Sequence, residues 1–494
     1  MTTYAHAHLH EARVTPPRET ADGHRAVDDV PLVVDLDGTL IRGDLLSEGL
    51  IHLLFHKPLS LFGAARSLIR GRASLKCYVA REAAVDIGAL AVDPDVLTLV
   101  RSARDQRRHI VLATGAAGPH PHTLAATYGI SEVITSSEST NLTGRAKLAA
   151  LLERYPEFDY VGNALTDLPL WKAARVPYAA NTSRHCLWRL RRERANAVRL
   201  TPARSVAREV VRELRPHQWA KNLLLFLPAI AAHIALSWNL LRVLAQGFAA
   251  FSFCASAIYV VNDIVDLPRD RRHPTKRLRP IAASTLQPAT ALAVAIGLAA
   301  ATVLLALSLP AGFEIALACY AATSLVYSFS LKRRLLVDVI ALASLYTIRI
   351  IAGAALTGIS LSQWFLAFSL FLFFALATAK RVSELRNQLA PDTAPNGRAY
   401  QRTDEFALLA LGTAATAATC LVYCLYVTSP DALRVYARPV VLWCGLPLLL
   451  YWQSRVWVFA FRGTLTEDPV AFALTDKTSY LVAGAFFTAV LAAT

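Results

Sequence analysis

Residues 262–280 read NDIVDLPRDRRHPTKRLRP and follow directly on a long apolar segment. Charged side chains at the end of a membrane-spanning helix are costly unless they face a wet cavity, so the aspartates of this stretch form a candidate site. Asp263, Asp266 and Asp270 are spaced at i, i+3 and i+7, which places them on one face of a helix. Pro268 is expected to end or kink that helix, so that Asp270 comes from the following loop.

The residue types of this stretch indicate a magnesium and phosphate site. Carboxylate and amide oxygens suit Mg²⁺, which commonly bridges carboxylates to substrate phosphates. Asn262 shares a helix face with Asp266 and Asp270. The cations that a diphosphate leaving group needs follow at Lys276, Arg277 and Arg279. The alternative is a solvated loop whose charges only set membrane topology.

The composition of the chain predicts a membrane protein with a separate water-soluble part. Of 494 residues 54% are hydrophobic, and the surplus lies after about residue 220. A transmembrane helix needs about 20 mostly apolar residues. Nine segments qualify as candidates: 222–238, 240–261, 289–309, 312–330, 335–357, 362–379, 405–428, 438–453 and 479–494.

The charge distribution predicts the orientation of these spans. Basic loops at 269–279, 332–334 and 380–402 lie on alternate connections, on the same side as the arginine-rich segment 184–215, and the positive-inside rule makes that side cytoplasmic. The net charge of +15 is explained by this topology, so no nucleic-acid partner is expected. We predict a multi-pass protein of a bacterial inner membrane.

The first part of the chain is expected to contain an α/β domain. Residues 1–29 have no apolar core of a signal peptide and are interpreted as a disordered lead. Residues 30–183 form the predicted domain, and 184–215 a basic juxtamembrane linker. An apolar strand leads into DLDGT at 35–39, where Asp35 and Asp37 point the same way and Gly38 permits a tight turn. In such a pair, one carboxylate can attack phosphorus while the other transfers the proton of the leaving group.

DLDGT resembles the first motif of the HAD phosphatase superfamily, and the later motifs follow in order. The resemblance implies a Rossmann-like HAD fold with a small helical cap at about 44–98. Thr114 stands in the place of the phosphate-binding hydroxyl, and Lys147 in that of the lysine that neutralises the nucleophile and the phosphate. The implied Mg²⁺ ligands are Asp35, Asp37, Asn163 and Asp167. Asn163 departs from the family pattern, which has an aspartate there, and a degenerate fold kept as a scaffold is the alternative reading.

The aspartate-rich stretch resembles the first motif of the UbiA prenyltransferase superfamily. The resemblance extends over about 210–490, including RPHQW at 215–219 and Lys221. It implies an all-α polytopic membrane bundle of about nine transmembrane helices (216–494), in which Asp263 and Asp266 are catalytic and bind Mg²⁺ together with Asp270. The chain is thus expected to be a multidomain protein.

The second aspartate motif of that superfamily is altered in this chain. Residues 327–338 read YSFSLKRRLLVD, with one acid and three bases. Fewer carboxylates and more cations favour direct binding of phosphate oxygens. The substrate-binding residues expected from these segments are Lys221, Asn262, Lys276, Arg277, Arg279, Tyr327, Lys332, Asp338, Lys380 and Arg381.

This pattern resembles the decaprenyl-phosphate phosphoribosyltransferase branch. The implied partners are a polyprenyl phosphate lipid, phosphoribosyl diphosphate and the membrane, with Mg²⁺ as cofactor, and a homo-oligomer is left open. The HAD domain would remove the 5-phosphate of the product, giving polyprenyl-phosphoryl-ribose for envelope polysaccharide. One alternative is an aromatic prenyltransferase of the quinone or haem pathway that uses a prenyl diphosphate donor. Another is a non-catalytic lipid-binding or transport protein.

Overall fold

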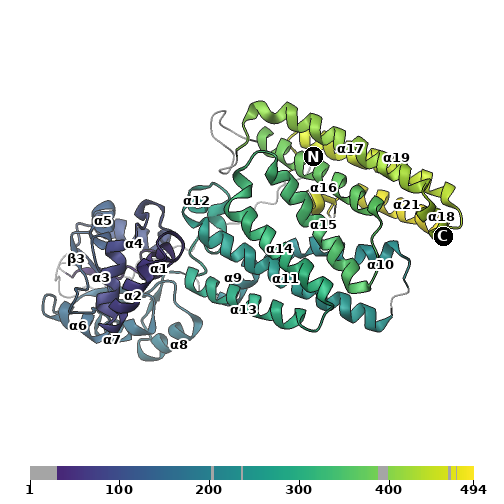
Figure 1. Ribbon diagram of the computed structural model, residues 1–494. Helices are drawn as coiled ribbons and strands as arrows, with labels where there is room; N and C mark the ends of the chain where they lie inside the picture. Colours follow the sequence, from purple (N-terminus) through teal and green to yellow (C-terminus); the bar gives the residue numbers. More distant parts are fainter. Residues whose placement is uncertain (1–29, 202–204, 235–236, 388–398, 466–468, 474) are drawn as a thin grey trace. The chain divides into compact units, whose positions relative to one another are not determined.

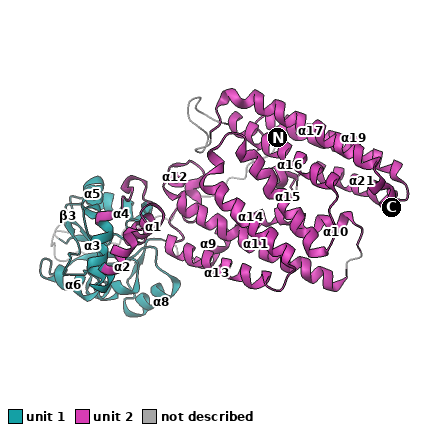
Figure 2. Ribbon diagram, in the orientation of Figure 1, with its two compact units in different colours: residues 1–41, 67–80, 92–203 teal, residues 42–66, 81–91, 204–494 magenta. Residues whose placement is uncertain are grey.

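The computed structural model describes residues 30–201, 205–234, 237–387, 399–465, 469–473 and 475–494, so the predicted lead at 1–29 lies outside the described residues. Figure 1 shows the elements in sequence colours. The chain divides into two compact units (Figure 2). Unit 1 comprises the chain up to residue 41 with 67–80 and 92–203, and unit 2 comprises 42–66, 81–91 and 204–494. Each unit is described by itself.

Unit 1 is built on a six-stranded parallel sheet in the order β3-β2-β1-β4-β5-β6. Its strands are β1 (Leu32–Val34), β2 (Ile110–Ala113), β3 (Glu132–Ile134), β4 (Asp159–Gly162), β5 (Pro177–Ala179) and β6 (Val198–Arg199). The first strand lies between β2 and β4, and all three are buried along their whole length. Fully buried parallel strands are apolar throughout, which is why β1 and β2 read as short hydrophobic runs.

Helices between the strands complete unit 1. They are α4 (Pro94–Asp105), α5 (His120–Tyr128), α6 (Arg145–Leu152), the single 3₁₀ turn η3 (Leu165–Asp167), α7 (Leu168–Ala173) and α8 (Arg184–Glu193), with most of α3 (Arg72–Glu82). The Asp93 carboxylate caps α4 by accepting hydrogen bonds from the backbone N–H groups of Asp95 and Val96. The core contains Val33, Tyr160 and Trp171.

The end of unit 1 differs from the predicted linker at 184–215. Helix α8 buries Leu187 and Leu190 in the core of unit 1, and β6 extends the sheet through β5. The apolar residues at i and i+3 of α8 give it one buried face, although four of its ten residues are arginines. Of the predicted linker, the described residues 205–215 belong to unit 2.

Unit 2 is helical. It contains α1 (Leu45–His56), part of α2 (Ser60–Ile69), the 3₁₀ turn η2 (Ile87–Ala89), α9 (Val206–Glu213), the 3₁₀ segment η4 (Pro216–Phe226), α10 (Leu227–Ala231), α11 (Trp238–Val265), α12 (Leu267–Arg272), η5 (Lys276–Leu278), α13 (Pro288–Ala306), α14 (Ala311–Phe329), η6 (Leu331–Arg333), α15 (Val337–Thr357), α16 (Gln363–Arg386), η8 (Arg402–Asp404), α17 (Glu405–Val427), α18 (Pro430–Val435), η9 (Pro439–Cys444), α19 (Gly445–Phe461), α20 (Pro469–Ala473) and α21 (Lys477–Ala493).

Six helices of the described chain are long and apolar enough to cross a membrane: α11, α13, α14, α15, α16 and η8 with α17. They correspond to six of the nine predicted spans, and the count of nine is not confirmed. The first predicted span, 222–238, is divided between η4 and α10. Pro216 begins η4 and Pro228 lies in the first turn of α10, and proline lacks the N–H that a continuous helix needs. The last two predicted spans correspond to α19 and α21, each of 17 residues.

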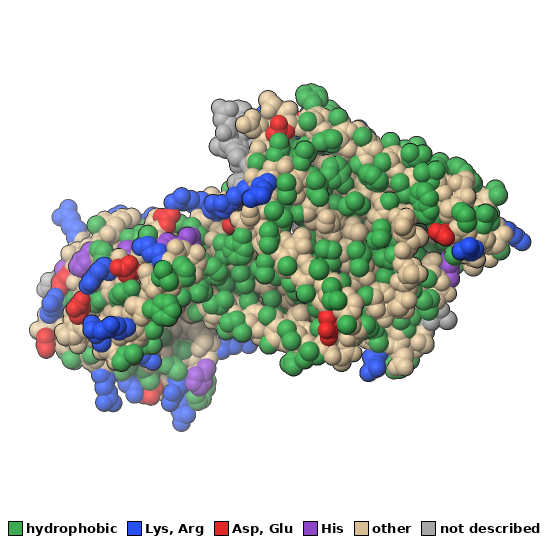
Figure 3. Space-filling model, viewed as in Figure 1, with side chains coloured by type: hydrophobic (Ala, Val, Ile, Leu, Met, Phe, Trp, Pro, Cys, Tyr) green, Lys and Arg blue, Asp and Glu red, His purple; other side chains and the backbone are tan. Residues whose placement is uncertain are grey.

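The outside of these helices is apolar. Ile296, Val303 and Leu304 on α13 are each more than half exposed, as are Phe406 and Leu421 on α17. Figure 3 shows hydrophobic side chains over most of the visible face of unit 2. Such an apolar surface is stable in contact with lipid rather than with water. The chain is therefore an integral membrane protein.

Candidate functional site

The predicted aspartates lie where α11 gives way to α12. Helix α11 ends at Val265, Asp266 joins the two helices, and α12 begins at Leu267 with Pro268 in its first turn. Asp263 and Asp270 are only 2% and 3% exposed, so both carboxylates are largely removed from water. Isolated buried charges of this kind are costly, and cations should therefore lie beside them.

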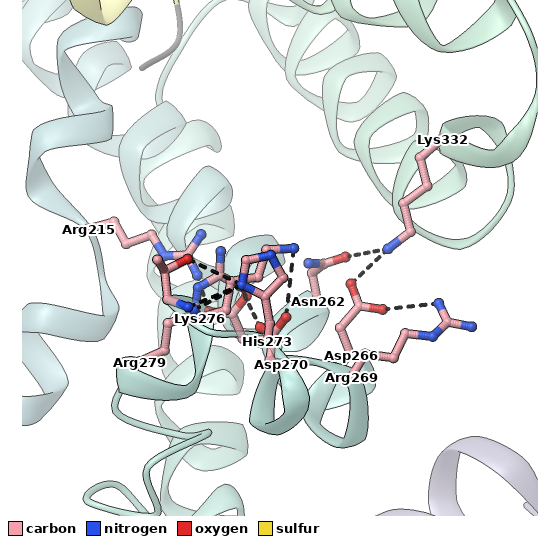
Figure 4. Close-up of polar contacts among 11 residues, drawn as sticks. Arg215, Asn262, Asp266, Arg269, Asp270, His273, Lys276, Arg279 and Lys332 are labelled. Carbon is pink, nitrogen blue, oxygen red and sulfur yellow. Dashed lines mark hydrogen bonds and ion pairs between the residues drawn. The ribbon is translucent and has the colours of Figure 1, made fainter. Parts of the chain in front are cut away.

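Each aspartate is paired with a cation from another segment (Figure 4). Arg279 donates to Asp263 over 3.0 Å and to Asp270 over 2.5 Å. Arg215 also pairs with Asp263. Lys332 donates to the Asp266 carboxylate over 2.8 Å. Three carboxylates near the end of α11, which we call the aspartate cluster, are thus paired with three cations from other segments of the chain.

The remaining predicted residues of this cluster lie at its margin. The Lys332 ammonium is 3.4 Å from the Asn262 amide oxygen, and the Lys276 ammonium is 3.9 Å from Asp270. Arg277 is exposed. Lys332 comes from η6, so residues 70 positions apart meet here.

A second polar cluster surrounds Asp338 at the start of α15. Asp338 is fully buried and accepts from Arg381 over 2.7 Å and from the Tyr400 hydroxyl. Arg381 also donates to the Tyr327 hydroxyl over 3.1 Å and to Glu384 over 2.6 Å. The structure therefore brings Tyr327, Asp338 and Arg381 together. They form a buried network of ion pairs and hydrogen bonds, in which the Arg381 side chain is only 2% exposed.

The two remaining predicted lysines lie on η4 and α16. Lys380 is half-buried on α16. Lys221 is 8% exposed, and its ammonium lies 5.8 Å from the centre of the Tyr346 ring.

The predicted residues of unit 1 converge at the carboxyl ends of three neighbouring strands. Asp35 follows β1, Thr114 follows β2 and Asn163 follows β4. Because parallel strands place their carboxyl ends at one edge, these residues meet there. Lys147, from α6, donates to Asp35 over 2.6 Å.

Two backbone features shape this edge. Gly38 has a φ of +74°, and a Cβ placed there would lie 1.9 Å from the Asn163 amide nitrogen, so only glycine lets Asn163 approach the Asp37 turn. Asp167 is 3% exposed and accepts hydrogen bonds from the backbone N–H groups of Asn163 and Ala164, each over 3.0 Å. The loop that carries Asn163 is therefore held from both sides.

The environment of Asp35 shifts its protonation. Burial raises the pKa of Asp35 from its ordinary value, and the Lys147 ammonium opposes that rise. The Thr39 hydroxyl donates to the second carboxylate oxygen over 3.3 Å. Thr114 is fully buried, and its hydroxyl accepts from the backbone N–H of Ala116 over 3.0 Å.

Comparison with known sequences identifies the membrane part. A family profile described as the UbiA prenyltransferase family matches residues 223–475, which is more than half of the chain. The chain belongs to the UbiA prenyltransferase family. The matched segment contains both polar clusters of unit 2 apart from Arg215, and it includes every candidate span of the described chain.

Relatives of this UbiA-family chain include proteins of different annotation. The uncharacterized protein y4nM of Sinorhizobium fredii is 35% identical over 92% of this chain and 90% of its own length. A decaprenyl-phosphate phosphoribosyltransferase of Mycobacterium tuberculosis is 39% identical over 188 residues, 37% of this chain and 62% of its own length. Among solved structures, a UbiA homolog from Archaeoglobus fulgidus bound to DMAPP and Mg²⁺ covers 58% of this chain and 98% of that one, with 17% identity and a TM-score of 0.43.

The aspartate cluster of the UbiA-family chain offers donors that suit Mg²⁺. Within the described residues no three acids, histidines or cysteines are already gathered around a common point. Magnesium is usually held by one or two carboxylates together with waters and substrate phosphates, so a complete protein cage is not required. Arg215, Arg279 and Lys332 now neutralise the carboxylates that a metal would neutralise, and the same cations can bind phosphate oxygens.

Burial also perturbs the acids near this cluster. Burial raises the pKa of Asp270, with Arg279 and Lys276 opposing the rise. Burial and the neighbouring Asp263 carboxylate raise the pKa of Glu213 to about 8. Neighbouring carboxylates repel one another when both are charged, and a cation relieves that repulsion.

Two polar residues of unit 2 were not predicted as site residues. Arg215 lies in a turn with a φ of +52° and was noted only as part of the RPHQW segment. Arg349 lies within the span α15 at 4% exposure, where it donates to Asn222 over 2.9 Å and to the Tyr320 hydroxyl over 3.1 Å. A charge in the middle of an apolar segment is a signal for such a residue, and that signal was present in the sequence.

Proposed function

We propose that unit 2 transfers phosphoribose from phosphoribosyl diphosphate to a polyprenyl phosphate, and that unit 1 removes the 5-phosphate from the product. The first observation in support is the composition of the site. Lys332 occupies the altered second motif and reaches Asp266, so a cation is present where the family pattern has carboxylates. A donor that carries both a diphosphate and a 5-phosphate needs such additional cations.

The transfer reaction follows from the charges at the end of α11. A phosphate oxygen of the lipid forms a bond to the anomeric carbon of ribose, the bond from that carbon to the diphosphate oxygen breaks, and pyrophosphate leaves with the electron pair. Asp263 and Asp266 would hold a Mg²⁺ ion, which supplies positive charge to the leaving group. Lys332 and Arg279 would bind the free phosphate oxygens and orient the donor.

The second observation in support is the pair of Asp35 and Lys147 in unit 1. Asp35 would attack the phosphorus of the 5-phosphate, the bond from phosphorus to the ribose oxygen would break, and Asp37 would protonate that leaving oxygen while Lys147 neutralises the negative charge. Water, deprotonated by Asp37, would then hydrolyse the phosphate bound to Asp35, which releases inorganic phosphate and restores both carboxyl groups. The oxygen donors Asp35, Asp37 and Asn163 suit a Mg²⁺ ion at the same edge of the sheet. The product, polyprenyl-phosphoryl-ribose, would serve as a precursor of envelope polysaccharide.

Lipid-dependent pyrophosphate release tests both steps. The purified protein is incubated with phosphoribosyl diphosphate, polyprenyl phosphate and Mg²⁺. The released pyrophosphate is quantified, and the mass of the lipid product is determined by mass spectrometry. We expect pyrophosphate only when the lipid is present, and a product that keeps its phosphate in the Asp35→Asn variant. Pyrophosphate release without lipid, or transfer from a prenyl diphosphate to an aromatic acceptor instead, would contradict the transferase assignment.

A further inference from the structure

Glu213 is a buried carboxylate outside the aspartate-rich stretch. It is the last residue of α9 and is 2% exposed. Neither of its carboxylate oxygens receives a hydrogen bond from a donor group within the part of the chain that the structure describes, while the Asp263 carboxylate lies within hydrogen-bonding range of it. A buried polar group without a partner is rare in folded proteins, and a buried carboxylate without one is especially costly. Its position therefore needs an explanation.

The surroundings of Glu213 are those of the aspartate cluster. The Asp263 carboxylate acts on it as a like charge, while Arg215 and Arg279 act as opposite charges. The hydrogen bonds of these two arginines, however, go to Asp263 and Asp270. Glu213 and Asp263 thus lie near the same two arginines, but these arginines donate hydrogen bonds to Asp263 and not to Glu213.

The fold fixes Glu213 in this place. Four residues earlier on α9, Glu209 accepts a hydrogen bond from the Thr285 hydroxyl over 2.8 Å. One residue later, the backbone oxygen of Leu214 accepts from the Ser256 hydroxyl on α11, also over 2.8 Å. Contacts on both sides, one with Thr285 and one with α11, hold the end of α9 in place, so Glu213 cannot turn to water without breaking one of them.

We propose that Glu213 is a further ligand of a divalent cation, Mg²⁺, that it binds together with Asp263. The inference rests on the magnesium part of the proposed function and adds a ligand that lies before the segment matched by the family profile. Two carboxylates are a sufficient protein contribution for Mg²⁺, with water and diphosphate oxygens completing the octahedron. A divalent cation between Glu213 and Asp263 gives the orphaned oxygens a partner and removes the repulsion.

Binding of Mn²⁺ to the full-length protein, measured by electron paramagnetic resonance without substrate, tests this inference. All variants carry Asp35→Asn, so that unit 1 contributes less to the signal. Loss of a residue that merely supports a metal ligand weakens metal binding about 10- to 100-fold, so Glu213→Gln should raise the Kd for Mn²⁺ at least about tenfold. Glu213→Asp, which keeps the charge, should retain part of the affinity.

The matched control is Glu209→Gln on the same helix. It removes one negative charge from α9, yet its amide oxygen can still accept from Thr285. We expect wild-type affinity for Mn²⁺ in this variant. Thermal unfolding in EDTA supplies a second readout, because Glu213→Gln should not lower the midpoint when no metal is bound but should reduce the increase that Mg²⁺ causes.

Each outcome bears on the inference separately from the transferase activity. Wild-type Mn²⁺ affinity in Glu213→Gln overturns it and leaves the proposed transferase intact. Absence of Mn²⁺ binding to the parent protein overturns it together with the metal part of the proposed function. Mn²⁺ binding that depends on Glu213, in a protein that releases no pyrophosphate, supports the ligand and contradicts only the transferase.

Discussion

The Lys332 ammonium donates to Asp266 over 2.8 Å, although 66 residues separate the two in the chain. Lys332 lies in η6 after α14, and Asp266 follows α11, so the pair joins the same ends of two different spans. The charge of Lys332 therefore balances that of Asp266 before any donor binds. A phosphate can then bind Lys332 while a metal ion binds Asp266, with little change in the net charge of the cluster.

Replacement of Lys332 by methionine should weaken donor binding. A hydrogen bond to a charged group contributes about 1.5–3 kcal/mol, which corresponds to an increase of about 10- to 150-fold in the KM for phosphoribosyl diphosphate. Steady-state kinetics with the lipid in excess measure this change. Arg334→Met in the same loop is the control, because Arg334 is exposed, and it should keep a wild-type KM. Equal KM values for the two variants would contradict the assigned role of Lys332.

Replacement of Arg381 by methionine should destabilise unit 2. Arg381 and Asp338 are 2% and 0% exposed, and removal of one partner of a buried ion pair costs about 3–5 kcal/mol. Thermal unfolding of the purified protein measures the loss. The double variant Arg381→Met with Asp338→Leu should lose less than the sum of the two single variants, because no uncompensated charge remains. Wild-type stability of Arg381→Met would show that the pair contributes through substrate binding instead.

Local patterns in the sequence predicted where several residues of the two candidate sites lie in the fold. Asp35 and Asp37 after an apolar run indicated a strand end, and the structure places them after β1 at the centre of the sheet. The spacing of Asp263, Asp266 and Asp270 indicated one face of a helix, with Asp270 in the loop after Pro268. The structure instead places Asp263 in α11, Asp266 between the two helices and Asp270 in α12, so the acids lie near one helix junction but not on one helix. Both predictions rest on helical and strand periodicity, which acts within a few residues.

Contacts between distant segments were not predictable in the same way. Asp338 is buried by Arg381 and Tyr400, which lie 43 and 62 residues further along the chain. In the sequence, Glu213 resembles any charged residue that precedes a membrane span. Its burial follows from the contact between the end of α9 and α11, which the sequence does not reveal. The first predicted span, 222–238, differs for another reason: it is not one α-helix, because Pro228 in the first turn of α10 lacks the N–H that a continuous helix needs.

The stability of unit 1 should decrease in acid through Asp159 at the start of β4. Burial would raise the pKa of Asp159, but hydrogen bonds from Arg175 and Arg108 outweigh burial and lower the pKa below its ordinary value of 3.8. A lowered pKa in the folded state means that the stabilisation is complete above pH 3.8 and disappears as the pH falls through the lowered value. Hydrogen exchange of β4 peptides across this range, corrected for intrinsic rates, measures the effect.

Asp159→Asn should abolish this acid sensitivity, because the amide does not titrate. The variant should also be less stable than the wild type at neutral pH, since Arg108 and Arg175 lose their charged partner. Asp105→Asn on α4 is the control, because Asp105 is exposed. An acid response in Asp159→Asn equal to that of the wild type would assign the sensitivity to other groups.

Asn163→Asp should strengthen the dependence of unit 1 on Mg²⁺. Asn163 lies against Gly38, so a carboxylate at this position joins Asp35 and Asp37 at the same edge of the sheet. Metal affinity rises with the number of charged ligands, and an increase of about tenfold is expected for one added charge. The concentration of Mg²⁺ that gives half-maximal hydrolysis of p-nitrophenyl phosphate should fall accordingly. Asn141→Asp, whose carboxylate can still accept from Lys76, is the control and should leave that concentration unchanged. An unchanged Mg²⁺ requirement in Asn163→Asp would mean that residue 163 does not contact the metal, and that Asp35 and Asp37 bind it without help from β4.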